Sequence, residues 1–178
     1  MGMEALFPRW SQMSARRMEH ARRVARLLGE WADAMGVGQS ERACWERAAY
    51  LHDALKDAPD SWLAEVTDDA WGVAALSHGP AAARMAAQHG ETDEGVLQAV
   101  RYHSVGYAHW DRVGIMLYLA DFLEPERTDA PDRAELAAGV PAALTDTLRA
   151  VARARIGYLV ANGKRLLPET VEFWNGLR

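Results

Sequence analysis

The stretch that decides the fold reads DRVGIMLYLADFL and spans residues 111–123 of the 178-residue chain. It is apolar along most of its length and Pro125 follows it, so the sequence predicts a buried helix that stops before the proline. Asp121 interrupts the apolar run. A carboxylate is costly to bury alone, so Asp121 is expected to be paired with an arginine, hydrogen-bonded or bound to a metal ion.

Helical patterns account for most of the remaining chain. Apolar residues recur at helical spacing over residues 14–35, and Gly36 and Gly38 then end the run. Similar patterns predict helices over 40–56, 80–90, 92–103 and 142–162, a short helix from Pro168, and short segments near 62–66 and 70–76. Alanine is abundant and strand signals are weak throughout. The sequence therefore predicts the all-α class, with an N-terminal segment over 1–13 and one compact multi-helix bundle over 14–178.

Composition restricts the classes of function. The formal net charge of −5 argues against a nucleic-acid-binding protein, because such domains usually carry a basic surplus. The single cysteine, Cys44, cannot form an internal disulfide. The sequence shows neither a secretion signal nor an apolar run long enough to span a membrane, so we expect a cytoplasmic protein with no membrane partner.

Four histidines and two aspartates, all within or beside predicted helices, are the candidate chemical residues: His20, His52, Asp53, His78, His103 and Asp121. His20 shares a helix face with Val24, Leu27 and Trp31 and should point to the interior. Each residue also has an ordinary structural alternative. A lone histidine on an apolar face is more often a hydrogen-bonded core residue, and His78 before Gly79 and Pro80 can be a turn residue.

His52 and Asp53 are adjacent, and adjacent helical residues project about 100° apart, so the pair can reach two points that flank one site. A carboxylate has two oxygens and can bridge two metal ions, whereas an imidazole offers one nitrogen to one ion. Mixed imidazole and carboxylate ligands suit Fe, Mn, Zn or Co. The sequence thus predicts a metal site in the interior of the bundle.

In this order, the residues resemble the HD superfamily of phosphohydrolases, and more narrowly its YqeK-type branch of symmetrical dinucleoside tetraphosphatases. The likeness covers residues 14–175, almost the whole chain. Its motifs here are Arg17 to His20 with Val24, Leu51 to Asp53 with Lys56, His78-Gly79, His103-Ser104 with Gly106, Leu119 to Pro125 with Arg127, and the closing Pro168, Thr170, Trp174 and Asn175. The ordered set, with its Glu-Pro-x-Arg extension, is far more specific than a His-Asp pair alone.

The resemblance implies symmetrical hydrolysis of diadenosine tetraphosphate to two ADP by a hydroxide that two metal ions activate. It implies two divalent ions, iron first and Mn, Co or Zn as alternatives, with Asp53 bridging and with six ligands: His20, His52, Asp53, His78, His103 and Asp121. The expected catalytic residues are His52, Asp53 and Lys56. The expected substrate contacts are Arg17, Lys56, His78, His103, Ser104, Arg127, Thr170 and Asn175.

Three alternatives remain open from the sequence. One is an HD-domain phosphohydrolase that acts on another nucleotide, and one is a non-catalytic sensor that binds ADP or a related nucleotide. The third is a helical interaction protein whose histidines are structural. The expected partner in the first two is a small molecule, a dinucleoside polyphosphate or ADP, and exposed tryptophans would permit a homodimer.

Overall fold

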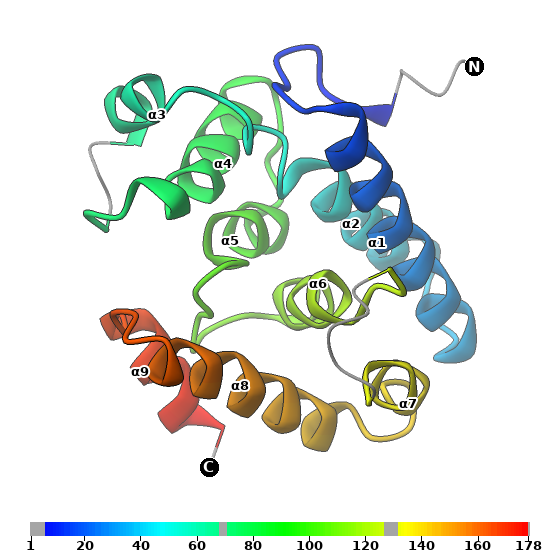
Figure 1. Cartoon of the computed structure of the whole chain (residues 1–178). Coiled ribbons are helices and arrows are strands. Elements are labelled where there is room, and N and C mark those ends of the chain that lie inside the picture. The colour runs from blue at the N-terminus through cyan, green and yellow to red at the C-terminus, as the bar shows by residue number, and fades with distance from the viewer. Residues whose placement is uncertain (1–5, 68–70, 127–131, 178) are drawn as a thin grey trace.

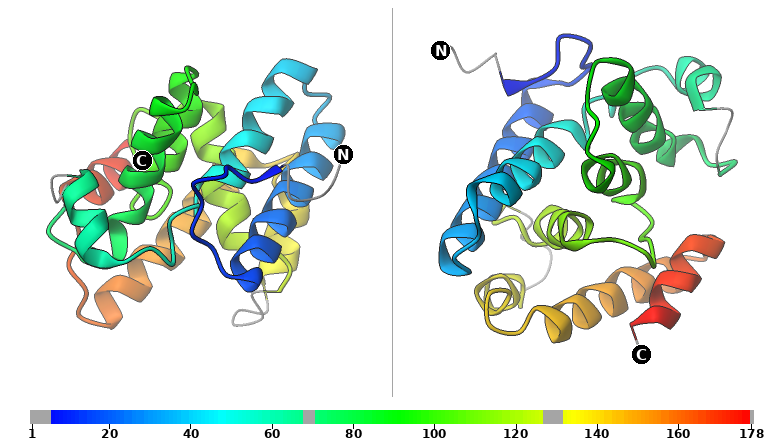
Figure 2. Two further views of the ribbon diagram at one scale, coloured as in Figure 1. Left: turned by 90° about the horizontal axis from the view of Figure 1, so that it is seen from above. Right: turned by 180° about the vertical axis from the view of Figure 1, so that it is seen from behind.

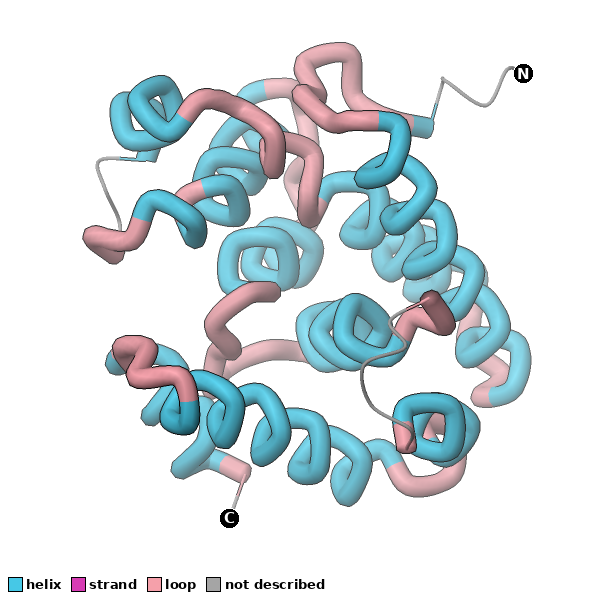
Figure 3. Tube along the Cα trace, in the orientation of Figure 1, coloured by secondary structure: helices cyan, strands magenta, loops and turns pink. Residues whose placement is uncertain are grey.

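The computed structural model describes residues 6–67, 71–126 and 132–177. These residues form helices and no strand, which confirms the all-α prediction (Figures 1 and 3). The elements in chain order are α1 (Ala15–Ala34), α2 (Gln39–Leu51), α3 (Asp60–Thr67), the 3-10 helix η2 (Ala74–Leu76), α4 (His78–Gln88), α5 (Glu94–Tyr102), α6 (Arg112–Leu123), α7 (Arg133–Gly139), α8 (Leu144–Ala161) and α9 (Pro168–Gly176). Among the helices of these described ranges, none is long and apolar enough to cross a membrane.

Helix α6 is the centre of the bundle. It contacts α1, α2, α5, α7 and α8, and Figure 1 shows it end-on between α1 and α2 on one side and α8 on another. Asp111 caps its start by accepting bonds from the backbone N–H groups of Val113 and Gly114, at 2.9 and 3.3 Å. Most of its residues are buried, which fits the prediction from the apolar stretch over 111–123.

The end of α6 follows from Pro125. The residue before a proline is driven out of the helical region, and Glu124 accordingly has extended dihedral angles, with φ −58° and ψ 142°. Glu124 is nevertheless 2% exposed, so its carboxylate turns back into the bundle. Pro125 therefore ends the helix, and the buried carboxylate of Glu124 lies directly after its last turn.

Helix α2 is shorter than the sequence pattern suggested. The prediction of a helix through Lys56 is wrong, because α2 ends at Leu51 and residues 52–57 form consecutive turns. Those turns are closed by short-range bonds such as Lys56 N–H to the Asp53 carbonyl, at 2.9 Å. His52 keeps helical dihedral angles as the C-terminal cap, so the His52–Asp53 pair lies where the helix gives way to a tighter backbone.

The other predicted helices are present, with boundaries shifted by a few residues. Helix α4 begins at His78, so Pro80 lies in its first turn, where a missing N–H costs little. The sequence pattern did not indicate α7.

The N-terminal residues from Phe7 onward pack on the bundle, with Phe7 7% exposed and Gln12 N–H bonded to the Ala54 carbonyl at 2.7 Å (Figure 2). The division of the chain at residue 13 stays a prediction.

Gly79 lets α4 approach α5 closely. A Cβ atom at this position would lie 2.9 Å from the Arg101 carbonyl oxygen and 3.0 Å from the Val100 carbonyl oxygen. Both contacts are with backbone, which cannot rotate away as a flexible side chain would. The residue next to His78 must therefore be glycine for α4 to bring His78 against His103 of α5.

We predict that Gly79→Ala lowers the free energy of unfolding by about 1–3 kcal/mol, because the added methyl group forces α4 away from α5. The matched control is Gly157→Ala in α8, where a Cβ meets nothing within 4 Å. That change should be neutral or stabilise by up to about 1 kcal/mol, since alanine favours the helix. Urea unfolding of both variants measures the difference, and equal stabilities would contradict the close approach.

Candidate metal centre

Six buried side chains converge in the interior as two groups. The first group is His20, His52 and Asp121, and the second group is Asp53, His78 and His103. Within each group the potential ligand atoms all lie within 4.8 Å of one another. These are the six residues that the sequence predicted as ligands, and they come from α1, α4 and α6 and from the residues that directly follow α2 and α5.

Each histidine directs its Nδ1 outward and its Nε2 into its group. The Nδ1 atoms of His52 and His103 donate to the carbonyls of Ala49 and Val100, three residues earlier, both at 2.7 Å. His78 donates in the same way to the Ala75 carbonyl, at 3.1 Å. A carbonyl oxygen can only accept, so these Nδ1 atoms carry the hydrogen, and a neutral ring then presents a lone pair at Nε2.

The Nε2 atoms face other acceptors. In the first group, His20 Nε2 lies 3.4 Å from His52 Nε2 and 3.2 Å from Asp121 Oδ1. In the second group, His78 Nε2 lies 3.1 Å from His103 Nε2. Lone pairs at such distances repel unless a cation or a proton lies between them. The donor set therefore fits two metal ions, one in each group.

Asp53 joins the two groups. Its Oδ1 lies 3.2 Å from His78 Nε2 and 3.6 Å from His103 Nε2, whereas its Oδ2 lies 3.8 Å from His52 Nε2. One carboxylate oxygen thus faces each group, which is the arrangement a bridging ligand needs. Burial acts to raise the pKa of Asp53, but its interactions with His52, His103 and His78 together outweigh burial, and the pKa lies well below the usual value.

Burial keeps two of the histidines in the form that binds metal. It lowers the pKa of His52 to about 4, and it also lowers the pKa of His78 to about 4. Both rings are therefore neutral at pH 7, with the Nε2 lone pair available to a metal ion.

Glu124 positions His20, and the sequence analysis did not single it out for this role. Its Oε1 accepts from His20 Nδ1 at 3.3 Å, and its Oε2 accepts from Arg23 Nε at 2.7 Å. Burial acts to raise the pKa of Glu124, but the bond and charge of Arg23 together with the bond from the Glu126 backbone N–H outweigh burial, and the pKa is lowered, which keeps the carboxyl ionised. A charged acceptor behind the ring fixes its orientation and increases the basicity of Nε2.

Three of the predicted substrate contacts lie beside the two groups. Arg17 NH1 is 3.9 Å from Asp53 Oδ2, and Lys56 Nζ is 3.1 Å from His78 Nε2. Ser104 Oγ is 3.0 Å from His103 Nε2. Their positions at the edge of the centre are compatible with contacts to a bound anion.

His78 and His103 belong to the second group itself, and the other predicted contacts are Thr170, Asn175 and Arg127. Thr170 of α9 is buried and donates to the Val105 carbonyl at 2.8 Å, so its hydroxyl anchors α9 to the segment after His103. Asn175 is exposed on α9. Arg127 lies outside the described residues. The roles of these three residues stay predictions.

A polar cavity of about 500 Å³ opens beside the first group. Its lining consists of His20, the arginines Arg16, Arg17 and Arg23, and the glutamates Glu19, Glu124 and Glu126. Three carboxylates thus balance the three guanidinium groups, and Arg23 is paired with two of them, Glu124 and Glu126. Of the three arginines, the sequence analysis singled out Arg17 alone, because pairs of arginines on a helix are usually solvated.

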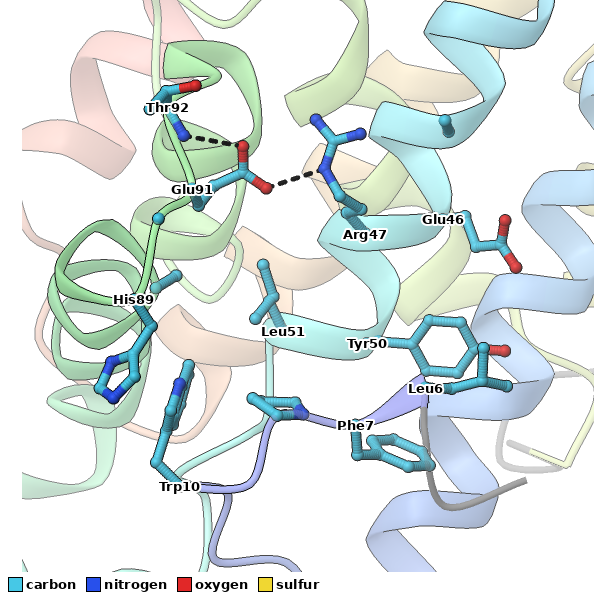
Figure 4. Close-up of a pocket in the computed structure, with 14 residues that line it drawn as sticks. Leu6, Phe7, Trp10, Glu46, Arg47, Tyr50, Leu51, His89, Glu91 and Thr92 are labelled. Carbon is cyan, nitrogen blue, oxygen red and sulfur yellow. Dashed lines mark hydrogen bonds and ion pairs between the residues drawn. The ribbon is translucent and has the colours of Figure 1, made fainter. Parts of the chain in front are cut away.

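A second cavity, of about 770 Å³, lies apart from the centre. It is formed by the N-terminal segment with α2 and the end of α4, and none of the six candidate ligands lines it. Figure 4 shows Trp10 beside His89 on its floor and the ion pair of Arg47 with Glu91 above them. Among the described residues, neither group of potential metal ligands lines this cavity, so the candidate chemistry is assigned to the buried centre.

Comparisons with known proteins agree with this geometry. A family model described as HD domain matches residues 17–138, a range that contains all six candidate ligands. The chain is similar to the symmetrical bis(5'-nucleosyl)-tetraphosphatase of Staphylococcus aureus (strain NCTC 8325 / PS 47), with 30% identity over 125 residues. The match covers 66% of this chain and 63% of that relative, which is less than two thirds of its length.

A solved structure shows the same fold. It is a crystal structure from Clostridium acetobutylicum described as a predicted HD superfamily hydrolase involved in NAD metabolism, and it matches with a TM-score of 0.81. The match covers 93% of this chain and 90% of that chain, at 24% sequence identity.

We predict that the metal-free protein loses stability as the pH falls from about 6.5 to 4. The pKa values of His52 and His78 are lowered in the folded state, so folding favours their neutral form. Their contribution is fully present above the unfolded value of about 6.5 and is lost as the pH falls through the folded value, on the order of 3 kcal/mol for each. Urea unfolding at several pH values measures the slope.

His78→Gln should make this slope shallower, because it removes one of the two groups. His109→Gln is the control, since the His109 side chain is 68% exposed and lies outside both groups. A stability that stays constant from pH 7 to 4.5 in the native sequence would contradict the assignment.

We further predict that Glu124→Gln lowers the metal affinity of the first group by about 10- to 100-fold, because the charge behind His20 is lost. Calorimetric titration with Mn²⁺ measures the affinity. Glu126→Gln is a matched control: Glu126 also contacts Arg23, at 3.1 Å, but its side chain is 69% exposed and lies in neither group. Equal affinities in the two variants would exclude a role for Glu124 at His20.

Proposed function

This chain belongs to the HD-domain family, and we propose that it is a metal-dependent phosphohydrolase that cleaves diadenosine tetraphosphate symmetrically to two ADP. The two sets of facing acceptor atoms, joined by Asp53, are the observation that carries the proposal. They fit two neighbouring divalent ions, for which we propose iron, with Mn, Co or Zn as the alternatives.

The substrate class is supported by charge and by similarity. Arg17 lies 3.9 Å from Asp53 Oδ2 and Lys56 lies 3.1 Å from His78 Nε2, and two cations beside the centre favour a polyphosphate over a neutral ligand. The relative from Staphylococcus aureus carries the name of a symmetrical bis(5'-nucleosyl)-tetraphosphatase. The substrate assignment therefore rests on these two cations together with the relative's name.

When two metal ions are bound, they supply a water of lowered pKa and offset negative charge on the phosphoryl oxygens. His20, His52, Asp53, His78, His103 and Asp121 would hold the ions. The chain's own cations would orient the substrate: Lys56, next to His78, would contact a phosphoryl oxygen, and Arg17 would contact the adjacent one. Ser104 would donate its hydroxyl to the same chain of phosphates.

The location of the reaction in the buried centre also excludes bulk water from the charged groups. All six candidate ligands are less than 9% exposed, so attraction between the ions and the phosphates is screened less than it would be at the surface. This reaction depends mainly on positioning and electrostatics, which such a site can supply without a dedicated protein acid.

We predict that the purified protein with Fe²⁺, Mn²⁺ or Co²⁺ converts diadenosine tetraphosphate to ADP, and that Asp53→Ala reduces the rate to background, because the ligand between the two groups is lost. Chromatography of the products against ATP, ADP and AMP standards measures both. His109→Ala, at an exposed position, should leave the rate unchanged.

The products separate the alternatives. ATP with AMP would exclude symmetrical cleavage, and turnover of a different nucleotide would exclude this substrate within the same family. Two bound ions with tight ADP binding and no turnover would favour a sensor. A protein that binds no metal would overturn the metal-dependent mechanism.

A further inference from the structure

Arg155 of α8 extends from outside the matched family region to the metal centre. Its NH1 lies 3.5 Å from Asp121 Oδ2, and its NH2 lies 3.3 Å from the Ser104 carbonyl oxygen. Its side chain is 19% exposed. The residue lies beyond position 138, where the family match ends, and the sequence analysis gave it no role.

The two oxygens of Asp121 face different neighbours. Oδ1 lies 3.2 Å from His20 Nε2 and 4.0 Å from His52 Nε2, so it points to the interior of the first group. Oδ2 points to Arg155. The guanidinium thus holds one oxygen of the carboxylate and directs the other toward the candidate metal position.

The guanidinium is itself held in place. Its carbon lies 4.5 Å from the ring centre of Tyr118 and 5.8 Å from that of Phe122, both on α6. Such cation–π contacts fix the plane of an arginine and compensate for part of its lost hydration. Tyr118 and Phe122 flank Asp121 on the same helix, so α6 carries both the carboxylate and the surface on which its partner rests.

Arg155 also spans the two groups. Asp121 belongs to the first group, while Ser104 directly follows His103 of the second. One planar side chain with several N–H donors can contact both, which a lysine ammonium with a single charged centre would do less well. The backbone after α5 and the carboxylate of α6 are therefore held at a fixed separation.

We propose that Arg155 is a positioning residue of the metal centre: it fixes Asp121 for coordination through Oδ1 alone and couples the first group to the backbone beside the second. This inference rests on the proposed metal-dependent function. It adds that α8, outside the family match, takes part in the centre through one side chain.

Titration of the protein with Co²⁺, followed by visible absorption, tests the proposal without any need for turnover. The native protein should bind two ions. Arg155→Met should weaken one of the two binding steps by about 10- to 100-fold and change the absorption of that ion, because Asp121 is free to rotate. Arg155→Lys should recover part of the affinity, since a positive charge near Oδ2 is restored.

Arg153→Met is the matched control, because Arg153 lies on the same helix and is exposed. A purely structural Arg155 would lower the melting temperature of the metal-free protein and leave both Co²⁺ steps and their absorption unchanged, which would overturn the proposal. With Co²⁺ at saturation and diadenosine tetraphosphate as substrate, Arg155→Met should lower kcat with little change in KM. A raised KM at constant kcat would instead make Arg155 a substrate contact.

Failure of this inference is distinct from failure of the proposed function. If the native protein binds no Co²⁺, the metal-dependent function itself is wrong. If the native protein binds two ions and Arg155→Met binds them equally well, only the role of Arg155 is wrong.

Discussion

Acceptor atoms that face one another at the centre of the bundle are the constraint on which the other features of the structure depend. His78 Nε2 and His103 Nε2 lie 3.1 Å apart, and His20 Nε2 and His52 Nε2 lie 3.4 Å apart. Their Nδ1 atoms are already used outward, so neither pair can relieve its repulsion by an internal hydrogen bond between neutral rings. Lys56 and Ser104 lie beside the second pair, at 3.1 Å from His78 Nε2 and 3.0 Å from His103 Nε2, and a pair of metal ions would offset the repulsion in both groups.

The arrangement of the helices brings these acceptor atoms together. Each ligand-bearing segment contacts α6 directly or through α5, so residues separated by up to about a hundred positions meet around one central helix (Figure 1). The close approach at Gly79 and the forced turn at Pro125 are local features with the same result. Gly79 lets the backbone of α4 lie closer to α5 than a residue with a Cβ atom would allow. Pro125 ends α6 at Leu123, so the Glu124 side chain can turn back toward the centre.

The sequence predicted those parts of the centre that depend on local pattern. Asp121 in its apolar run and His20 on its apolar helix face both indicated the interior, and the ordered motifs indicated the family. The early end of α2 was not predictable, because residues 52–57 favour a helix by composition and the tighter turns are set by contacts such as Gln12 with Ala54 and Asp57. The roles of Glu124 and Arg155 were also beyond reach, since each acts on a partner about 30 to 100 residues away and belongs to a residue type that is usually solvated.

The two groups differ in how their ligands are held, and this difference bears on how the centre works. In the second group, both histidines are anchored to carbonyls three residues earlier, at Ala75 and Val100, so their orientation is set by the local backbone. In the first group, His52 has the same kind of anchor, at Ala49, whereas His20 depends on Glu124 and Arg23, and Asp121 depends on Arg155. Those ion pairs come from distant elements, and His20, Arg23 and Glu124 also line the polar cavity. A polyanion that enters there competes with Glu124 for Arg23, so the occupancy of the cavity and the orientation of His20 are physically coupled, whereas His52, His78 and His103 are oriented by their own backbone.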